Sequence, residues 1–560
     1  MTKIIRKCRI LIVTMLFMLS FESLVYGDSR TDQVDALFEK WDKTDTPGCA
    51  LGVIQDGEFV YKRGYGMANL EHAIPNSPAT VFRTGSVSKQ FTAMSVVLAD
   101  AKGKLSLDDD LRKHLPEMPQ YETTVTIRHL IHHTSGIRDY LVLMALAGKR
   151  DEDYYTNEEV MEALARLENL NFTPGSEYLY SNAGYWLLSQ IIARATGQTL
   201  RQWAEEEMFQ PLGMKNTHFH DDPRMIVQHR ASGYRPREEG GFEIDMTPLE
   251  MVGDGGVFTS IDDLLEWDGN FDRKTLGGKD VMAEMLTPGR FNNGEAQDYA
   301  GGLRVSHYRG LPIVEHGGAF VGFRAGMVRF PEQDFSAYCL CNVSEAEPTE
   351  LIHRIADIYL DGHFQDEDMQ TVSLPEDILQ QWTGAYWDAG TSQLLEIKLE
   401  EGRLQIVSEG QPLPLLPLSE TRFITDRKQA KVDLQFHEGR DRQPLRMEVQ
   451  SEGQRPFEYE RVQPAEPSAD ELEDYVGSFF CRELDAIYDV KVDERAKLVV
   501  DFAHFPEQTL EPIFNGAFQH EFGNLVFERS GDGTVSGFRL SAGRARNFVF
   551  VRRKSGSDPS

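Results

Sequence analysis

Ser86 and Lys89 have the residue types and the spacing of a serine nucleophile and its base. Apolar residues recur at helical spacing from Val87 onward, which predicts that a loop enters a helix at Ser86. Residues three apart share one helix face, so the hydroxyl and the amine can meet. A serine hydroxyl is a weak nucleophile, and a buried amine beside it can remove its proton. The free NH groups at the start of the helix also face negative charge that develops on a substrate.

A sheet must hold this helix in place, and the sequence predicts its strands at two separated positions. Residues 48–55 and 58–64 flank Asp56-Gly57, the strongest short signal for a β-hairpin. Helical patterns dominate from there to about residue 290. Strand-like runs then return, at residues 299–305, 313–315, 322–329 and 336–342. This pattern favours one sheet whose outer strands are separated in the sequence by a helical block.

Three motifs together resemble one enzyme family. Residues 82–92, FRTGSVSKQFT, strongly resemble the nucleophile segment of the penicillin-recognising serine hydrolases, which include class C β-lactamases, D-alanyl-D-alanine carboxypeptidases, esterases and D-aminopeptidases. Tyr180-Ser181-Asn182 and His316-Gly317-Gly318 follow in the order that the family has. With the stretches between them, the resemblance covers roughly residues 33–360. It implies an α/β (α+β) serine β-lactamase-like domain, in which helices flank an antiparallel sheet.

The resemblance also implies a role for each residue of the first two motifs. Ser86 would be the acylated nucleophile, and Lys89 and Tyr180 would share the general-base and general-acid work. A phenol with a pKa near ~10 is a poor base at neutral pH, so Tyr180 needs a nearby cation such as Lys89. Asn182 would orient Lys89 and the substrate amide. The sequence leaves open whether Tyr180 or Lys89 takes the first proton.

The third motif implies an oxyanion hole and carries a departure from many relatives. The backbone NH of Ala319, after Gly318, would hold the oxyanion together with the NH of Ser86. Where β-lactamases of the family usually have lysine, this sequence has His316, which we count with the catalytic residues. A histidine is mostly neutral at pH 7, which weakens recognition of a substrate carboxylate. The departure counts against a β-lactamase more than against a peptidase or an esterase.

Two stretches with the composition of linkers, residues 365–376 and 463–468, divide the rest of the chain. Between and after them the sequence alternates in short strands with frequent turn residues, which predicts small antiparallel β-barrels. The two barrel sequences resemble each other at a spacing of about 93 residues. The matched pairs are Leu379 and Leu472, Trp382 and Tyr475, Gly384 and Gly477, and Tyr386 and Phe479. We therefore predict a hydrolase domain at 28–364 and barrel-like domains at 374–463 and 469–555.

The N-terminus and the overall charge limit where the protein acts and on what. Residues 1–27 have a basic start and an apolar run too short to span a membrane comfortably, which predicts a cleaved signal peptide and a secreted or periplasmic protein. A retained anchor is the alternative; no later stretch is long and apolar enough to span. The net charge of −31 disfavours nucleic acid and anionic lipid as partners. The expected partner is a small peptide or ester, no metal or cofactor is expected, and a homodimer stays open.

The order of one α/β domain and two β domains resembles the D-aminopeptidases of the family. It implies release of N-terminal D-amino acids through an acyl-enzyme, with a loop of the last barrel reaching the active site. Acidic groups on that loop would suit a substrate ammonium, with Asp485, Asp489 and residues 504–508 as candidates. An esterase, a D-Ala-D-Ala carboxypeptidase and a β-lactamase are alternatives within the family. A non-catalytic cell-wall-binding protein is the alternative from another class.

Four cysteines follow the proposed signal peptide: Cys49, Cys339, Cys341 and Cys481. They are too few for a chain of this length to depend on a disulfide framework. Cys339 and Cys341 alternate with Tyr338 and Leu340 in a strand-like run, so we expect them to pack as small buried side chains. The sequence does not fix the disulfide state.

Overall fold

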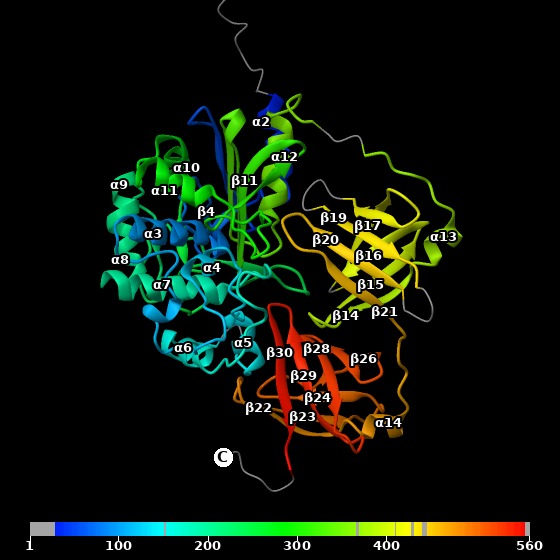
Figure 1. The fold of residues 1–560 in the computed structure, drawn as a ribbon. Helices are drawn as coiled ribbons and strands as arrows, with labels where there is room; N and C mark the ends of the chain where they lie inside the picture. The colour runs from blue at the N-terminus through cyan, green and yellow to red at the C-terminus, as the bar shows by residue number, and fades with distance from the viewer. Residues whose placement is uncertain are drawn as a thin grey trace, which may run out of the picture.

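The computed structural model describes residues 29–150, 153–365, 369–408, 410–426, 431–439 and 445–554. The proposed signal peptide lies outside the described residues. Figure 1 shows three parts: a mixed part of helices and sheet in blue to green, a β part in yellow, and a β part in orange to red.

A six-stranded antiparallel sheet forms the centre of the first part, in the order β10-β11-β12-β13-β1-β2. The strands are β1 (Cys49–Gln55), β2 (Glu58–Tyr65), β10 (Arg304–Tyr308), β11 (Leu311–Phe320), β12 (Phe323–Phe330) and β13 (Phe335–Cys341). Early and late segments of the first part therefore meet where β1 pairs with β13, as the sequence predicted. The strand expected at 299–305 instead begins at Arg304, and the one expected at 313–315 extends to Phe320.

Helices cover both faces of this sheet (Figure 1). On one face, α2 (Ser29–Phe38) and α12 (Pro348–Tyr359) share a core with Leu51 and Val53 of β1. Ala50 and Ile54 of the same strand belong to the core on the opposite face, because side chains alternate along a strand. The other helices of this part are α3 (Lys89–Ala101), α4 (Ile127–Ile131), α5 (Tyr140–Leu146), α6 (Asn157–Ala165), α7 (Asn182–Thr196), α8 (Leu200–Ala204), α9 (Gln210–Leu212), α10 (Ile261–Arg273) and α11 (Gly278–Leu286). Within the described ranges, no helix has both the length and the apolar character needed to cross a membrane.

The second and third parts are antiparallel β structures with the same beginning. Each starts with a short helix and a strand, α13 (Glu376–Gln380) with β14 and α14 (Ala469–Glu473) with β22, at a spacing of 93 residues. Strands β14 to β21 close into a barrel, and β22 to β30 form a nine-stranded sheet that nearly closes. The first set is β14 (Gly384–Asp388), β15 (Gln393–Glu400), β16 (Arg403–Ser408), β17 (Gln411–Pro417), β18 (Arg422–Thr425), β19 (Val432–His437), β20 (Arg446–Ser451) and β21 (Phe457–Val462). The second set is β22 (Gly477–Cys481), β23 (Ala486–Val492), β24 (Leu498–Asp501), β25 (Gln508–Thr509), β26 (Glu511–Phe514), β27 (Ala517–His520), β28 (Gly523–Arg529), β29 (Val535–Ala542) and β30 (Ala545–Arg552).

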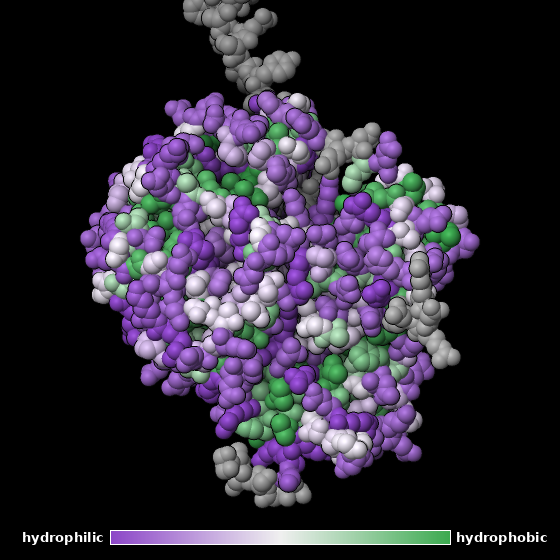
Figure 2. All heavy atoms as spheres, in the orientation of Figure 1, coloured by the Kyte–Doolittle hydropathy of each residue, from purple (hydrophilic) through white to green (hydrophobic). Residues whose placement is uncertain are grey.

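The third part is docked firmly against the first. Buried apolar side chains of both parts belong to one continuous core. Within the contact, Arg138 and Glu483 form an ion pair at 2.8 Å, and the Arg138 side chain is only 1% exposed. Tyr488 also donates a hydrogen bond to the carbonyl of Leu146, at 3.0 Å. Figure 2 shows that the outer face is largely hydrophilic, with an apolar patch where β22 and β30 lie in Figure 1.

Cys49 and Cys341 form a disulfide between the neighbouring strands β1 and β13. The two residues are direct partners in the register of β1 and β13. The expectation that Cys341 serves only in packing is therefore wrong, because 292 residues separate the partners and their pairing depends on a strand register that local patterns do not define. Cys339 is free and buried, as expected for a packing residue, and Cys481 is free and buried as well.

We expect the double variant Cys49→Ala/Cys341→Ala to be less stable than the native protein by about 3–5 kcal/mol, because the bond closes a long loop in the unfolded chain. Guanidinium unfolding followed by tryptophan fluorescence measures the difference. The matched control is Cys339→Ala/Cys481→Ala, which removes two sulfur atoms without removing a bond. An equal loss of stability in both double variants would show that packing, not the cross-link, is responsible.

Candidate active site

Ser86 lies at the start of η1 (Gly85–Ser88), a 3-10 turn that continues into α3. Strand β11 approaches this turn so closely that a Cβ atom on Gly318 would lie 2.1 Å from the carbonyl oxygen of Thr84. Gly85 has φ +52°, and a Cβ atom there would lie 2.7 Å from the nitrogen of Ala319. Glycine at both positions permits the contact. The predicted oxyanion-hole segments, at Ser86 and Ala319, are thus held side by side.

Lys89 is completely buried and has three polar neighbours. Its Nζ atom lies 2.8 Å from Oδ1 of Asn182, 2.6 Å from the carbonyl oxygen of Asp254 and 3.2 Å from Oγ of Ser86. The first two neighbours can only accept hydrogen bonds here, so they use two N–H groups. In the neutral amine, the remaining lone pair faces the Ser86 hydroxyl. Burial lowers the pKa of Lys89 to about 7, so the neutral amine is well populated near neutral pH.

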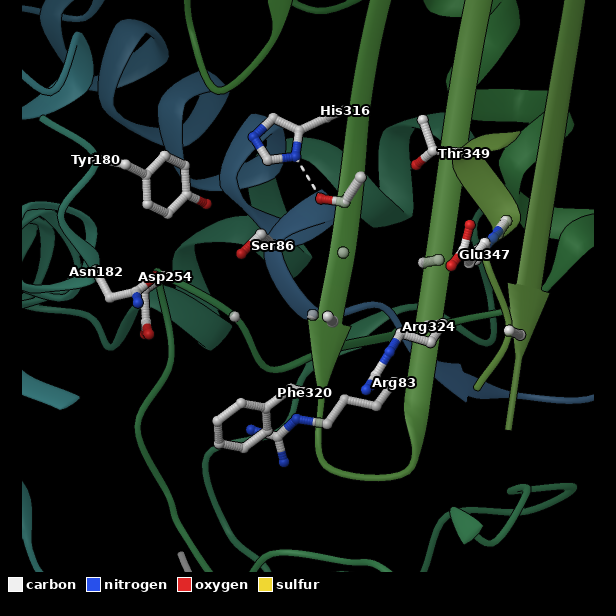
Figure 3. A pocket seen from close by; sticks show the side chains of 18 of the residues that line it. Arg83, Ser86, Tyr180, Asn182, Asp254, His316, Phe320, Arg324, Glu347 and Thr349 are labelled. Carbon is white, nitrogen blue, oxygen red and sulfur yellow. Dashed lines mark hydrogen bonds between the residues drawn. The ribbon is translucent and has the colours of Figure 1, made fainter. Parts of the chain in front are cut away.

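Tyr180 faces the same serine and the same lysine. Lys89 Nζ lies 4.7 Å from the centre of the Tyr180 ring, and Figure 3 shows the Tyr180 hydroxyl pointing toward Ser86. Burial nevertheless raises the pKa of Tyr180 well above its usual value, and the interaction with Ser86 only opposes this shift. The phenol is therefore protonated at neutral pH, although a cation lies beside it. Of the two bases left open by the sequence, the structure favours Lys89.

His316 lies on the part of β11 that extends beyond β10, and two hydrogen bonds fix its ring. Nδ1 lies 2.6 Å from the carbonyl oxygen of Gly317, to which it donates, so Nε2 accepts from the hydroxyl of Tyr299 at 2.9 Å. Burial lowers the pKa of His316 to about 3, and the nearby Lys89 adds to the shift. The ring is therefore neutral at physiological pH and does not supply a fixed cation.

The seven residues singled out from the sequence come together at one cavity of about 1050 Å³. Lys89 reaches it through its bonds to Ser86 and Asn182, and the other six line it: Ser86, Tyr180, Asn182, His316, Gly318 and Ala319. Figure 3 shows Ser86 near the middle, with Tyr180 and His316 toward one end of β11 and Phe320 with Arg83 toward the other. The predicted nucleophile, base, proton donor and oxyanion hole thus share one cavity, and these are the parts that acyl transfer needs.

The β-lactamase family model matches residues 34–360, more than half of the chain. The chain therefore belongs to the β-lactamase family. This family comprises the penicillin-recognising serine hydrolases, so the protein is a serine hydrolase, as the sequence motifs predicted.

Several relatives within the family are known. A D-aminopeptidase of Gluconobacter oxydans is 32% identical over 298 residues, which is 53% of this chain and 56% of that protein. Penicillin-binding protein 4* of Bacillus subtilis is 30% identical over 414 residues, covering 69% of this chain and 89% of that protein. The chain spans less than two thirds of the length of the D-aminopeptidases it matches. An octameric penicillin-binding protein homologue from Pyrococcus abyssi shares the fold, with a TM-score of 0.54 at 23% identity over 76% of this chain and 99% of that one.

The residues that line the cavity of this serine hydrolase and were not singled out from the sequence include Asp254 and Arg544. Asp254 lies beside Asn182 in Figure 3. The Gly255-Gly256 pair that follows it in the sequence is typical of an ordinary turn, so it did not mark Asp254 as a site residue. Arg544 lies in the turn between β29 and β30, in the third part. No motif marks it, because its place depends on how that part docks.

The third part thus reaches the cavity, but with a residue of the opposite charge from the one expected. Among the described residues, Arg544 is the member of that part that lines the cavity. Asp485, Asp489 and residues 504–508 do not line it, so the expectation of an acidic loop is wrong. The sequence could not distinguish which of several turns faces the first part.

Proposed function

We propose that the protein is a peptidase that releases N-terminal D-amino acids from short peptides through an acyl-enzyme on Ser86. The D-aminopeptidase relatives, about 30% identical over the hydrolase domain, support this choice within the family. The observation that carries it is the carboxylate of Asp254 at the cavity wall.

Asp254 offers a negative charge where the amine of an N-terminal residue would lie. The residue is 8% exposed. One carboxylate oxygen accepts from the Tyr140 hydroxyl at 3.1 Å, while Oδ1 is buried and accepts no hydrogen bond. A buried acceptor without a donor is costly. A substrate ammonium at the cavity wall would offset the charge of this carboxylate, whereas an N-acylated peptide or a short acyl ester has no such charge to offer.

The two ends of the cavity suit the two parts of the peptide. Tyr180 is the proton donor for the departing amine, and its ring lies 6.3 Å from that of His316. The leaving group therefore occupies the His316 end of β11. The D-residue extends toward the other end, past Asp254 to Phe320, where the Arg83 guanidinium stacks at 4.8 Å (Figure 3).

The reaction then follows from the hydrogen bonds around Ser86. Lys89 takes the hydroxyl proton as Oγ attacks the peptide carbonyl, and the NH groups of Ser86 and Ala319 hold the resulting oxyanion. The C–N bond breaks, and Tyr180 gives its proton to the departing amine. The proton on Lys89, which lies beside the Tyr180 ring, then replaces the one that the phenol gave up. Water attacks the ester carbon, its proton passes to Lys89, and the D-amino acid leaves as Ser86 regains its hydrogen.

The direct test compares D-alanyl p-nitroanilide with its L-isomer, N-acetyl-D-alanyl p-nitroanilide, acyl-D-Ala-D-Ala, nitrocefin and short acyl esters. Release of D-alanine from the free-amine D-substrate in preference to the others supports the proposal. Turnover of esters, of acyl-D-Ala-D-Ala or of nitrocefin without cleavage of free-amine D-peptides would replace it with the corresponding esterase, carboxypeptidase or β-lactamase.

We expect Asp254→Asn to reduce kcat/KM for D-alanyl p-nitroanilide by about 10–100-fold, because a charge-assisted hydrogen bond to the ammonium is lost. Hydrolysis of the N-acetylated substrate, measured in the same variant, should change far less. Glu350→Gln is the matched control, since Glu350 also lines the cavity but lies on α12 and is largely exposed. Equal losses on both substrates would assign Asp254 a structural role instead.

A further inference from the structure

The turn that carries Arg544 is fixed to the hydrolase domain at two points. The carbonyl oxygen of Arg544 accepts a hydrogen bond from Nδ2 of Asn171 at 2.9 Å, and Oδ1 of Asn171 accepts one from the backbone of Arg546 at 2.8 Å. Arg546 also pairs with Glu177 at 3.0 Å, and only 4% and 13% of the two side chains are exposed. These hydrogen bonds and this ion pair hold the tip of the β29–β30 hairpin at the cavity.

The Arg544 guanidinium lies beside the proposed proton donor. Its Cζ atom is 4.7 Å from the centre of the Tyr180 ring. Its nearest carboxylate is Asp139, at 3.8 Å, and that carboxylate already accepts backbone hydrogen bonds from Asn182 at 2.7 Å and Leu141 at 3.0 Å. The Arg544 side chain is 46% exposed, and it donates no hydrogen bond to any described residue at the site. Its N–H groups are therefore available to a ligand.

We propose that Arg544 binds the α-carboxylate of a leaving group that is a single amino acid, so that the preferred substrates are dipeptides with an N-terminal D-residue. The proposal rests on the proposed function and names the substrate class for the same site. Tyr180 protonates the departing nitrogen, and the carboxyl carbon of a single residue lies only about 2.5 Å from that nitrogen. A guanidinium offers two parallel N–H groups that match a carboxylate.

The neutral state of His316 leaves this task to another residue. A substrate carboxylate at the leaving-group end needs a cation, and His316 accepts from Tyr299 and stays uncharged. Arg544 supplies a permanent positive charge at that end, from the third part of the chain. A longer peptide places an uncharged amide where the carboxylate would lie, so it forgoes the ion pair and brings further residues against the hairpin tip.

The test compares D-Ala-Gly with D-Ala-Gly amide, in the full-length protein and in Arg544→Met, Arg544→Lys and the control Arg539→Met, whose side chain pairs with Glu528 on the same sheet. We expect the native enzyme to favour the free acid by at least about tenfold in kcat/KM. Arg544→Met should lose about 10–100-fold on the acid and bring the ratio of acid to amide near one. The ratio in Arg544→Lys should lie between those of the native protein and Arg544→Met, and the ratio in Arg539→Met should equal that of the native protein.

The ratio of kcat/KM for the acid to kcat/KM for the amide separates carboxylate recognition from any effect of Arg544 on Tyr180. A change in the proton donor would lower kcat/KM equally for both substrates. Equal kcat/KM values for acid and amide in the native enzyme, or equal losses on both in Arg544→Met, would overturn this inference while leaving the proposed function in place. Failure to cleave either dipeptide or D-alanyl p-nitroanilide would overturn both. An unchanged melting temperature of Arg544→Met shows that the hairpin remains docked.

Discussion

Replacing Ser86 with alanine is expected to lower kcat for D-aminoacyl substrates by about 10⁴-fold or more, since loss of a serine nucleophile removes the covalent route. The hydroxyl has no structural partner to lose among the described residues, because its hydrogen bond is to Nζ of Lys89. The variant should therefore keep the native melting temperature. Steady-state release of p-nitroaniline and the mass of the protein after treatment with a fluorophosphonate measure the effect, and only the native chain should gain one adduct.

Ser88 provides the matched control for this experiment. It is the second serine of the same motif, but its Oγ lies 3.0 Å from Thr84 Oγ1 and accepts from the backbone of Val257 at 3.0 Å. We expect Ser88→Ala to be less stable and still to be labelled. If the Ser86→Ala protein is labelled and active, another residue is the nucleophile. If the native protein is not labelled, the alternative of a non-catalytic binding protein is restored.

The sequence could locate these candidate site residues because the position of each one depends on a single helix or strand. A serine and a lysine three residues apart at a helix start must share a face, whatever surrounds them. Asn182 stands at the start of α7, and His316 and Ala319 lie on one strand, so each position follows from one element. The β-hairpin at Asp56-Gly57 was predicted for the same reason, and both residues have positive φ, as such a turn requires.

The parts that the sequence missed depend on contacts between distant elements. Cys49 and Cys341 meet because β1 pairs with β13, and the register of that pairing is set by the packing of the whole sheet. Arg544 reaches the cavity because buried pairs such as Arg138 with Glu483 dock one part on another. Burial also reversed the expected effect on Tyr180: Lys89 lies beside the ring as predicted, but desolvation raises the pKa of the phenol.

The rate of acylation is expected to increase with pH up to about 7 and then to level off, because burial lowers the pKa of Lys89 to about 7 and the amine must be neutral to accept the Ser86 proton. Below pH 7, the protonated fraction rises and the rate should fall about tenfold per pH unit. Labelling by a fluorophosphonate measures this directly, since the reagent has no amine of its own to titrate. Histidines near the site do not explain such a profile, because burial lowers the pKa of His132 to about 4 and that of His316 to about 3.

The variant Lys89→Met should lower the labelling rate by about 10³–10⁴-fold and remove the inflection near pH 7, since general-base assistance is lost while the nucleophile remains. Met has nearly the length of lysine but leaves Asn182 Oδ1 and the Asp254 carbonyl without their donor, so thermal unfolding must show a folded protein. Tyr180→Phe is the informative comparison. It should retain the inflection at pH 7 and lose mainly the expulsion of poor leaving groups, so its kcat falls more on D-alanyl amide than on a D-alanyl ester. An inflection that stays in Lys89→Met and disappears in Tyr180→Phe would make the tyrosine the base, in spite of its burial.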